Sequence, residues 1–205
     1  MSGDDRVDEE KRATLRRFAT VGASAPLVGA AGNASAETGE SDARDAISGY
    51  LTTTPGAHFS KIRDDLKLGT GETQHHLRTL EEAGTIERYR DGDYSRFVPA
   101  GRFDDFEKTA LGYLRRETPR GMVIHLLREP DAPAGSLAES LGVSAPTVSK
   151  YAAELERQGL LERVDGYSLV RPASLLVLLT RHADSFGRDA LELASDADRL
   201  LSYTA

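Results

Sequence analysis

A repeat of 75 residues is the feature of this sequence that most limits its fold. At that offset apolar positions meet apolar positions without a gap, and the turn residue Gly84 meets Gly159. Two segments that agree at core and turn positions are most simply two copies of one folding module. The agreeing pairs are Ile62 with Leu137, Leu66 with Leu141, Leu68 with Val143, Thr73 with Val148, Leu80 with Leu155, Glu81 with Glu156, Ile86 with Leu161, Glu87 with Glu162 and Arg88 with Arg163.

The first copy has the pattern of a helix-turn-helix. Between Leu68 and Leu80, residues that tolerate burial recur every three or four positions, as one stripe of a helix requires. The stripe comprises Thr73, His76, Leu77 and Leu80, and the opposite face carries Gln74, His75 and Arg78. A Gly-Thr-Gly break precedes this helix, and the apolar pattern of Ile62 and Leu66 precedes the break. This order predicts a helix, a tight turn and a second helix with a polar face.

A β-hairpin is predicted directly after this helix pair. The strand-prone runs 85–90 and 94–98 surround Asp91-Gly92-Asp93, and Asp-Gly is typical of a hairpin turn. Two helices followed by a hairpin form the winged helix-turn-helix arrangement. Our hypothesis is therefore that the chain reads DNA.

The second copy carries the clearest family resemblance. Residues 141–163, reading LGVSAPTVSKYAAELERQGLLER, resemble the recognition-helix segment of ArsR- and MarR-type winged-helix regulators. Residues 68–88 are similar, with a less typical turn. Two such modules after a small tail resemble the tandem winged-helix regulators of haloarchaea over residues 41–171. The resemblance implies DNA-binding regulators of transcription, in which terminal helices commonly form the dimer.

These patterns predict a mainly α protein with small β-hairpin wings (α+β), built from two tandem winged helix-turn-helix domains and C-terminal helices. The predicted domains are a low-complexity tail over 1–40, a first winged helix over 41–101, a connector helix and second winged helix over 102–171, and terminal helices over 172–205. We expect Ser41 and Asp42 to cap the first helix, Ser60 to cap the second and Ser144 to cap the recognition helix of the second copy. The apolar face of 174–200 either packs back on the second module or pairs with a partner chain.

Residues near the start and on the outer face of the third helix of each module are the predicted DNA contacts, because they reach base edges in the major groove. Gln74 can pair bidentately with adenine, and Arg78 with guanine or phosphate. The second copy has a poorer face, with Ala153 where the first has Arg78. The predicted contacts are Thr70, Gly71, Gln74, His75, Arg78, Arg88, Arg90 and Arg96 in the first copy, and Ser144, Pro146, Ser149 and Lys150 in the second.

The net charge of −7 is the main argument against DNA binding, because the binding surface of a DNA reader should be basic. Two features answer it. Arginines cluster on the helix and hairpin of the first copy, where a winged helix meets phosphate. The excess of Asp and Glu with scarce Lys resembles proteins of salt-accumulating archaea, and at about 1 M salt the Debye length is roughly 3 Å, so distant acidic groups repel DNA little.

The first 40 residues leave two interpretations open. Arg16-Arg17, a weak apolar stretch from Phe18 to Ala31 and Ala34-Ser35-Ala36 imitate an export signal with a twin arginine. The apolar stretch contains Gly22, Pro26 and Gly29 and is too weak for a membrane span. The alternative is a mostly disordered tail of small residues.

The sequence gives little support for a metal site, a nucleotide site or a catalytic site. Glu72, His75 and His76 lie within one helical turn, but three adjacent ligands on a partly buried stripe do not complete a metal shell. The Gly-Thr-Gly break lacks the Gly-Lys-Ser/Thr ending of a phosphate loop. A nucleophile and base at recognisable spacing are absent from the sequence, so an enzyme is not expected.

We therefore expect a cytoplasmic, site-specific regulator whose partner is double-stranded DNA. It is expected to need no cofactor or metal, to have no membrane partner, and to form a homodimer if the C-terminal helices pair. The alternatives are a winged-helix scaffold for protein interactions and a membrane-associated regulator held by the N-terminal segment.

Overall fold

The computed structural model describes residues 3–22, 36–130, 132–164 and 166–201. The described chain is mainly helical with two small antiparallel sheets, as predicted. It divides into two compact units, Met1–Phe103 and Asp104–Ala205.

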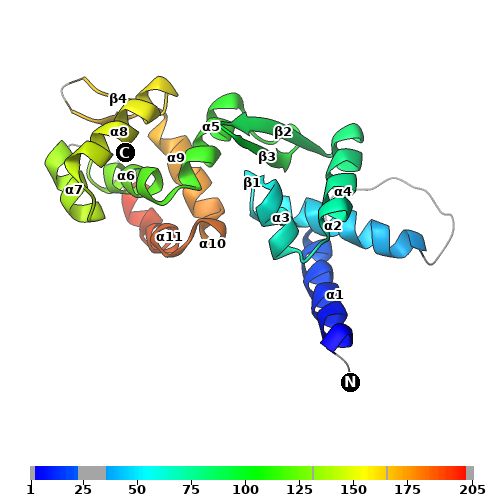
Figure 1. Cartoon of the computed structure of the whole chain (residues 1–205). Helices are drawn as coiled ribbons and strands as arrows, with labels where there is room; N and C mark the ends of the chain where they lie inside the picture. The colour runs from blue at the N-terminus through cyan, green and yellow to red at the C-terminus, as the bar shows by residue number, and fades with distance from the viewer. Residues whose placement is uncertain (1–2, 23–35, 131, 165, 202–205) are drawn as a thin grey trace. The chain divides into compact units, whose positions relative to one another are not determined.

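The first unit contains a winged helix-turn-helix preceded by an additional helix (Figure 1). Its three-stranded sheet has the order β1-β3-β2, and Asp91 pairs with Tyr94 across the tip of the predicted hairpin. Gly92 at this tip has a φ of 58°, a conformation that glycine adopts without strain. The elements are α1 (Gly3–Gly22), α2 (Ala36–Thr53), β1 (Ala57–His58), α3 (Phe59–Asp65), α4 (Thr70–Glu82), β2 (Ile86–Asp91) and β3 (Tyr94–Pro99).

The core of this unit lies between α2, α3, α4 and the sheet. Ile47, Leu51, Ile62 and Leu66 are fully buried there. The predicted stripe of α4 is confirmed, because Thr73, His76, Leu77 and Leu80 are all buried. Burial of this stripe fixes which face of α4 remains exposed to solvent.

The N-terminal segment differs from the predicted disordered tail. Residues 3–22 form α1, and α2 begins at Ala36 instead of after Ser41. The side chain of Leu15 is buried in the core, and the ring of Phe18 meets that of Tyr50 edge-on with 5.3 Å between centroids. Packing against α2 therefore stabilises α1, whose own apolar pattern is weak. Ala34 and Ser35 of the predicted cleavage motif, and most of the apolar stretch before it, fall in 23–35, outside the described residues. Ala36, the last residue of that motif, is the first residue of α2.

The cap of α3 also differs from the prediction. His58, and not Ser60, is the N-cap residue, and its Nδ1 accepts the backbone N–H of Lys61 at 3.3 Å. The helix begins at Phe59 because β1 ends at His58, so the turn into α3 is set by strand pairing with β3.

The second unit contains another helix-turn-helix with a short wing, followed by three helices. Ser144 caps α8 as predicted, accepting the backbone N–H of Thr147. Asp165, within the predicted second winged-helix domain, lies outside the described residues. The elements are α5 (Asp105–Leu114), α6 (Glu117–Arg128), α7 (Ala134–Leu141), α8 (Ala145–Arg157), β4 (Leu161–Glu162), β5 (Ser168–Leu169), α9 (Pro172–Arg181), α10 (Ala183–Phe186) and α11 (Arg188–Leu201).

The two helix-turn-helix segments have matching bounds. Each end of α8 lies 75 positions after the corresponding end of α4. Gly84 and Gly159, after these helices, have φ of 67° and 69°. None of the described helices is long and apolar enough to cross a membrane.

Candidate nucleic-acid interface

The outer face of α4 presents the predicted DNA contacts to solvent. Thr70, Gly71, Gln74 and His75 are exposed, and the side chain of Arg78 is 80% exposed. His76, one position after His75, is buried on the opposite side. The helix thus holds polar groups outward on a surface fixed by its buried stripe.

The first turn of α4 is stabilised by Glu72. Its Oε2 accepts the backbone N–H of Gly69, the N-cap residue, at 3.0 Å. Lys11 of α1 donates to both carboxylate oxygens, at 2.9 and 3.1 Å. Partial burial by itself would raise the pKa of Glu72, but the hydrogen bonds from Lys11 and Gly69 and the charges of Lys11 and His76 together lower this pKa below its ordinary value. Glu72 is therefore held as a carboxylate at the amino end of the helix, where negative charge is favourable.

Arg78 forms an ion pair that solvent and phosphate can reach. Its Nε donates to Oε1 of Glu82, one turn later, at 2.7 Å, and this hydrogen bond raises the pKa of Arg78. Both side chains are largely exposed, so the pair contributes little to stability. Arg78 can consequently exchange Glu82 for a phosphate or a base edge at small cost.

A groove of about 580 Å³ runs between α4 and the hairpin. Leu77 and Phe97 provide apolar surface, while Gln74, Arg78 and Arg88 provide polar groups. Arg88 lies opposite Phe97 in the sheet, and its Nε is 3.2 Å from Oε1 of Glu81 on α4. Phe59, Ser95 and Phe97 also line the groove and were not predicted from the sequence. Alternation along β2 places Arg88 and Arg90 on one face of the sheet, and their partners on β3 are Phe97 and Ser95. This pairing is the signal that could have indicated Ser95 and Phe97.

The two other predicted wing arginines have different environments in the structure. Arg90 is exposed and lies opposite Ser95, on the same face as Arg88. Arg96 is 3% exposed, donates from Nε to Oδ2 of Asp91 at 2.6 Å, and donates from a terminal nitrogen to the carbonyl of Gly56 at 2.9 Å. The prediction that Arg96 contacts phosphate was wrong, because this arginine links the hairpin to the turn before β1.

The corresponding face in the second unit is exposed and less basic. Pro146, Ser149 and Lys150 are exposed on α8, while Ser144 is engaged as its cap. Nε of Arg163 donates to Oε2 of Glu156 at 2.7 Å. This pair lies 75 positions after Arg88 and Glu81, so the same contact joins the start of the wing to the recognition helix in both units.

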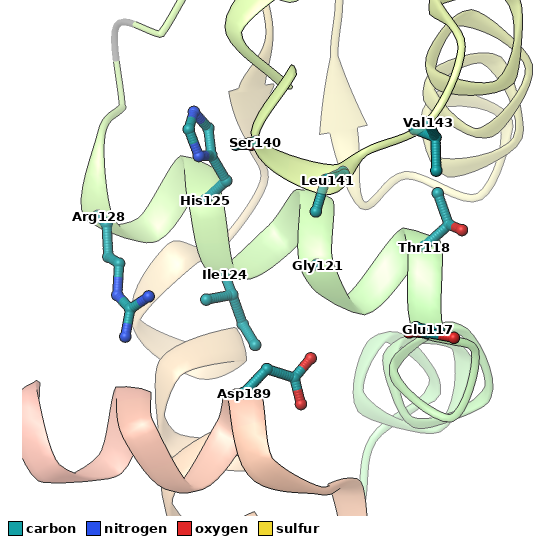
Figure 2. Close-up of a pocket in the computed structure, with 10 residues that line it drawn as sticks. All are labelled: Glu117, Thr118, Gly121, Ile124, His125, Arg128, Ser140, Leu141, Val143 and Asp189. Carbon is teal, nitrogen blue, oxygen red and sulfur yellow. The ribbon is translucent and has the colours of Figure 1, made fainter. Parts of the chain in front are cut away.

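The second unit also contains a cavity of about 460 Å³ between α6, α7 and α11. Figure 2 shows His125 and Arg128 toward one end and Glu117 and Thr118 toward the other, with the side chains of Ile124 and Leu141 between them. Nε of Arg120 donates to Asp189 on the α11 side at 2.7 Å. The cavity thus adjoins the end of α7, where the turn into α8 begins.

Comparison with known proteins supports the helix-turn-helix assignment of both units. A family model described as an N-terminal HTH domain matches residues 41–111. A model of the MarR family matches residues 120–167. The two matched segments contain α4 and α8, respectively.

A curated relative is similar over part of its length. An uncharacterized HTH-type transcriptional regulator of Methanocaldococcus jannaschii is 29% identical over 121 residues, which is 59% of this chain. The aligned region spans 30% of that relative. The chain is therefore similar to helix-turn-helix proteins in both of its units, and to MarR-family proteins in the second.

Proposed function

We propose that the chain is a transcriptional regulator that binds specific sequences of double-stranded DNA. The first unit places α4 in the major groove and its wing on phosphates. The observation that carries this proposal is the exposed set of Gln74, His75 and Arg78 on α4. Of these, Gln74 and Arg78 line the groove between α4 and the hairpin. Both matched family models and the name of the relative support a regulator of helix-turn-helix type.

The chemistry of this face suits base reading. The amide of Gln74 can donate to and accept from adenine, and the guanidinium of Arg78 can donate twice to guanine. Arg88 and Arg90 on β2 offer positive charge to the adjacent backbone. Glu81 and Glu82 hold two of these arginines in place until phosphate replaces them.

The second unit has a smaller part in base reading. Ala153 occupies the position equivalent to Arg78, so the outer face of α8 lacks the donor pair that best recognises guanine. Ser149 and Lys150 remain available for phosphate. This unit instead contributes weaker backbone contacts or assembly.

Pairing of two chains through the C-terminal helices is part of the proposal. Val177 on α9 is 54% exposed and Leu191 on α11 is 43% exposed. Replacing both with Glu should reduce the sedimentation coefficient to that of a monomer without lowering helix content. A wild-type chain that already sediments as a monomer at micromolar concentration would contradict pairing.

Selection from a pool of random duplexes tests the proposed function. The purified chain should enrich one motif at moderate salt and again near 1 M. A variant with Gln74→Ala and Arg78→Ala should lose this enrichment, while the matched variant with Ser149→Ala and Lys150→Ala retains it. Failure of the wild type to enrich any duplex would reject DNA reading in favour of a scaffold that binds proteins.

A further inference from the structure

α1 is an additional helix that contacts the recognition helix of the first unit. Its Lys11 bridges to Glu72 in the first turn of α4 at 2.9 Å, and its Glu10 pairs with Lys67 in the turn between α3 and α4. Leu15 anchors the same helix in the core. These contacts position α1 beside the end of α4 that approaches the bases in a winged-helix complex.

The orientation of α1 about its axis follows from these contacts. Lys11 and Leu15 face the rest of the unit. Consecutive residues of an α-helix are rotated by about 100°, so the residue before and the residue after each of these two point to opposite flanks of α1. Glu10 occupies the flank that meets Lys67. Arg12 and Arg16 follow Lys11 and Leu15, so they occupy the other flank, where both are exposed.

Among the described residues of the first unit, Arg12 and Arg16 differ from most cations in having no carboxylate partner. Ion pairs are formed in this unit by Lys11, Lys61, Arg63, Lys67, Arg78 and Arg88. Within the described part of the chain, neither Arg12 nor Arg16 forms one. They lie four residues apart, about 6 Å along the helix, so their guanidinium groups form one basic strip.

We infer that Arg12 and Arg16 of α1 extend the DNA interface of the first unit by binding the phosphate backbone beside the start of α4. This inference rests on the proposed function. Phosphate contacts raise affinity for all sequences and position the protein, without selecting bases. Each neutralised phosphate also adds to the dependence of affinity on salt.

Salt titration of DNA affinity tests the inference, with the selected duplex and an unrelated duplex as probes. Arg12→Gln and Arg16→Gln should each reduce the slope of log affinity against log salt by about 1, and the double variant by about 2. At low salt the double variant should bind both duplexes roughly tenfold more weakly than the wild type. The ratio between the two duplexes should not change.

Arg17→Gln is the matched control on the same helix. Arg17 is exposed, but it lies about two turns after Glu10 and therefore on the flank of Glu10, opposite Arg12 and Arg16. Its guanidinium carbon is 5.8 Å from the centre of the Phe18 ring. This variant should retain the wild-type slope and affinity. Circular dichroism should show the same helix content in all variants.

The outcomes separate the inference from the proposed function. If the wild type discriminates between the duplexes while the double variant keeps its slope, or if Arg17→Gln loses as much slope as either arginine, the inference is overturned and the proposed function stands. If the wild type binds the two duplexes equally and Gln74→Ala has no effect, the proposed function fails. In that case the inference fails too if the double variant keeps the wild-type dependence of affinity on salt. If this dependence is weaker in the double variant, Arg12 and Arg16 bind DNA of any sequence.

Discussion

Lys67 and Gly142, 75 positions apart, hold the same left-handed backbone conformation, with φ of 55° and 61°. Each lies at the turn that leads into a recognition helix, and Gly142 is the C-cap residue of α7. For a residue with a Cβ atom this conformation costs about 1–2 kcal/mol, which glycine avoids. Lys67 therefore has a strained backbone conformation, and its ammonium group pairs with Glu10 of α1.

Replacement of Lys67 tests this interpretation. Lys67→Gly and Lys67→Ala both remove the pairing with Glu10, but only glycine relieves the backbone. The glycine variant should therefore have a free energy of unfolding about 1 kcal/mol higher than the alanine variant, measured by urea denaturation. Equal stability of the two variants would show that the turn carries no strain.

The burial of Arg96 gives a second prediction. Its side chain is 4% exposed and that of Asp91 is 10% exposed, so removing one partner leaves a buried charge. Arg96→Ala should lower the free energy of unfolding by about 3 kcal/mol. Arg90→Ala, on the exposed face of the neighbouring strand, should change it by less than about 0.5 kcal/mol. Comparable losses from both substitutions would contradict the structural role of Arg96.

The helix-turn-helix and wing could be predicted because their signals are local. The stripe of α4 repeats every three or four residues, and Asp91-Gly92 marks the hairpin turn. Arg96 could not be assigned in this way, since its partner carbonyl at Gly56 lies 40 residues earlier in the chain. Its position in an arginine-rich hairpin resembles that of a phosphate contact until the packing of the sheet is known.

α1 was missed for a similar reason. Its apolar positions are few, and its stabilising partners, Lys67 and Glu72, lie 57 and 61 residues away from Glu10 and Lys11. Opposite charges at Glu10 and Lys11 gave no sign of these distant contacts. The exposed face of α4 was predictable from periodicity alone, whereas the groove beside it required the register of β2 and β3.

The lowered pKa of Glu72 predicts a loss of stability in acid. Because its pKa in the folded chain is below the ordinary value of 4.5, the contribution of Glu72 to stability is fully present above about pH 4.5 and disappears as the pH falls through the lower, folded-state value. Glu72→Gln should thus be less stable than the wild type at pH 7, and the difference should narrow as the pH falls below 4.5. Glu9→Gln, an exposed change on α1, controls for loss of one charge. A difference that does not depend on pH would contradict the assignment.

Close packing of α6 on α7 gives a prediction for the second unit. A Cβ atom on Gly121 would lie 2.5 Å from Cδ2 of Leu141, at the cavity shown in Figure 2. Gly121→Val should therefore lower the free energy of unfolding by about 1–3 kcal/mol. Gly135→Val is the matched control, because a Cβ at Gly135 meets no described heavy atom within 4 Å. Equal effects of the two substitutions would show that α6 and α7 do not depend on close approach at Gly121.

A double-mutant cycle between Gln74 and the adenines of the selected duplex tests the central claim most directly. Equilibrium affinities are measured for the wild type and Gln74→Ala on the selected duplex and on duplexes changed at one adenine each. If Gln74 reads a base, the two changes are non-additive at one position, with a coupling of about 1–3 kcal/mol. Full additivity at every adenine, with Gln74→Ala binding as tightly as the wild type, would contradict base reading by the outer face of α4.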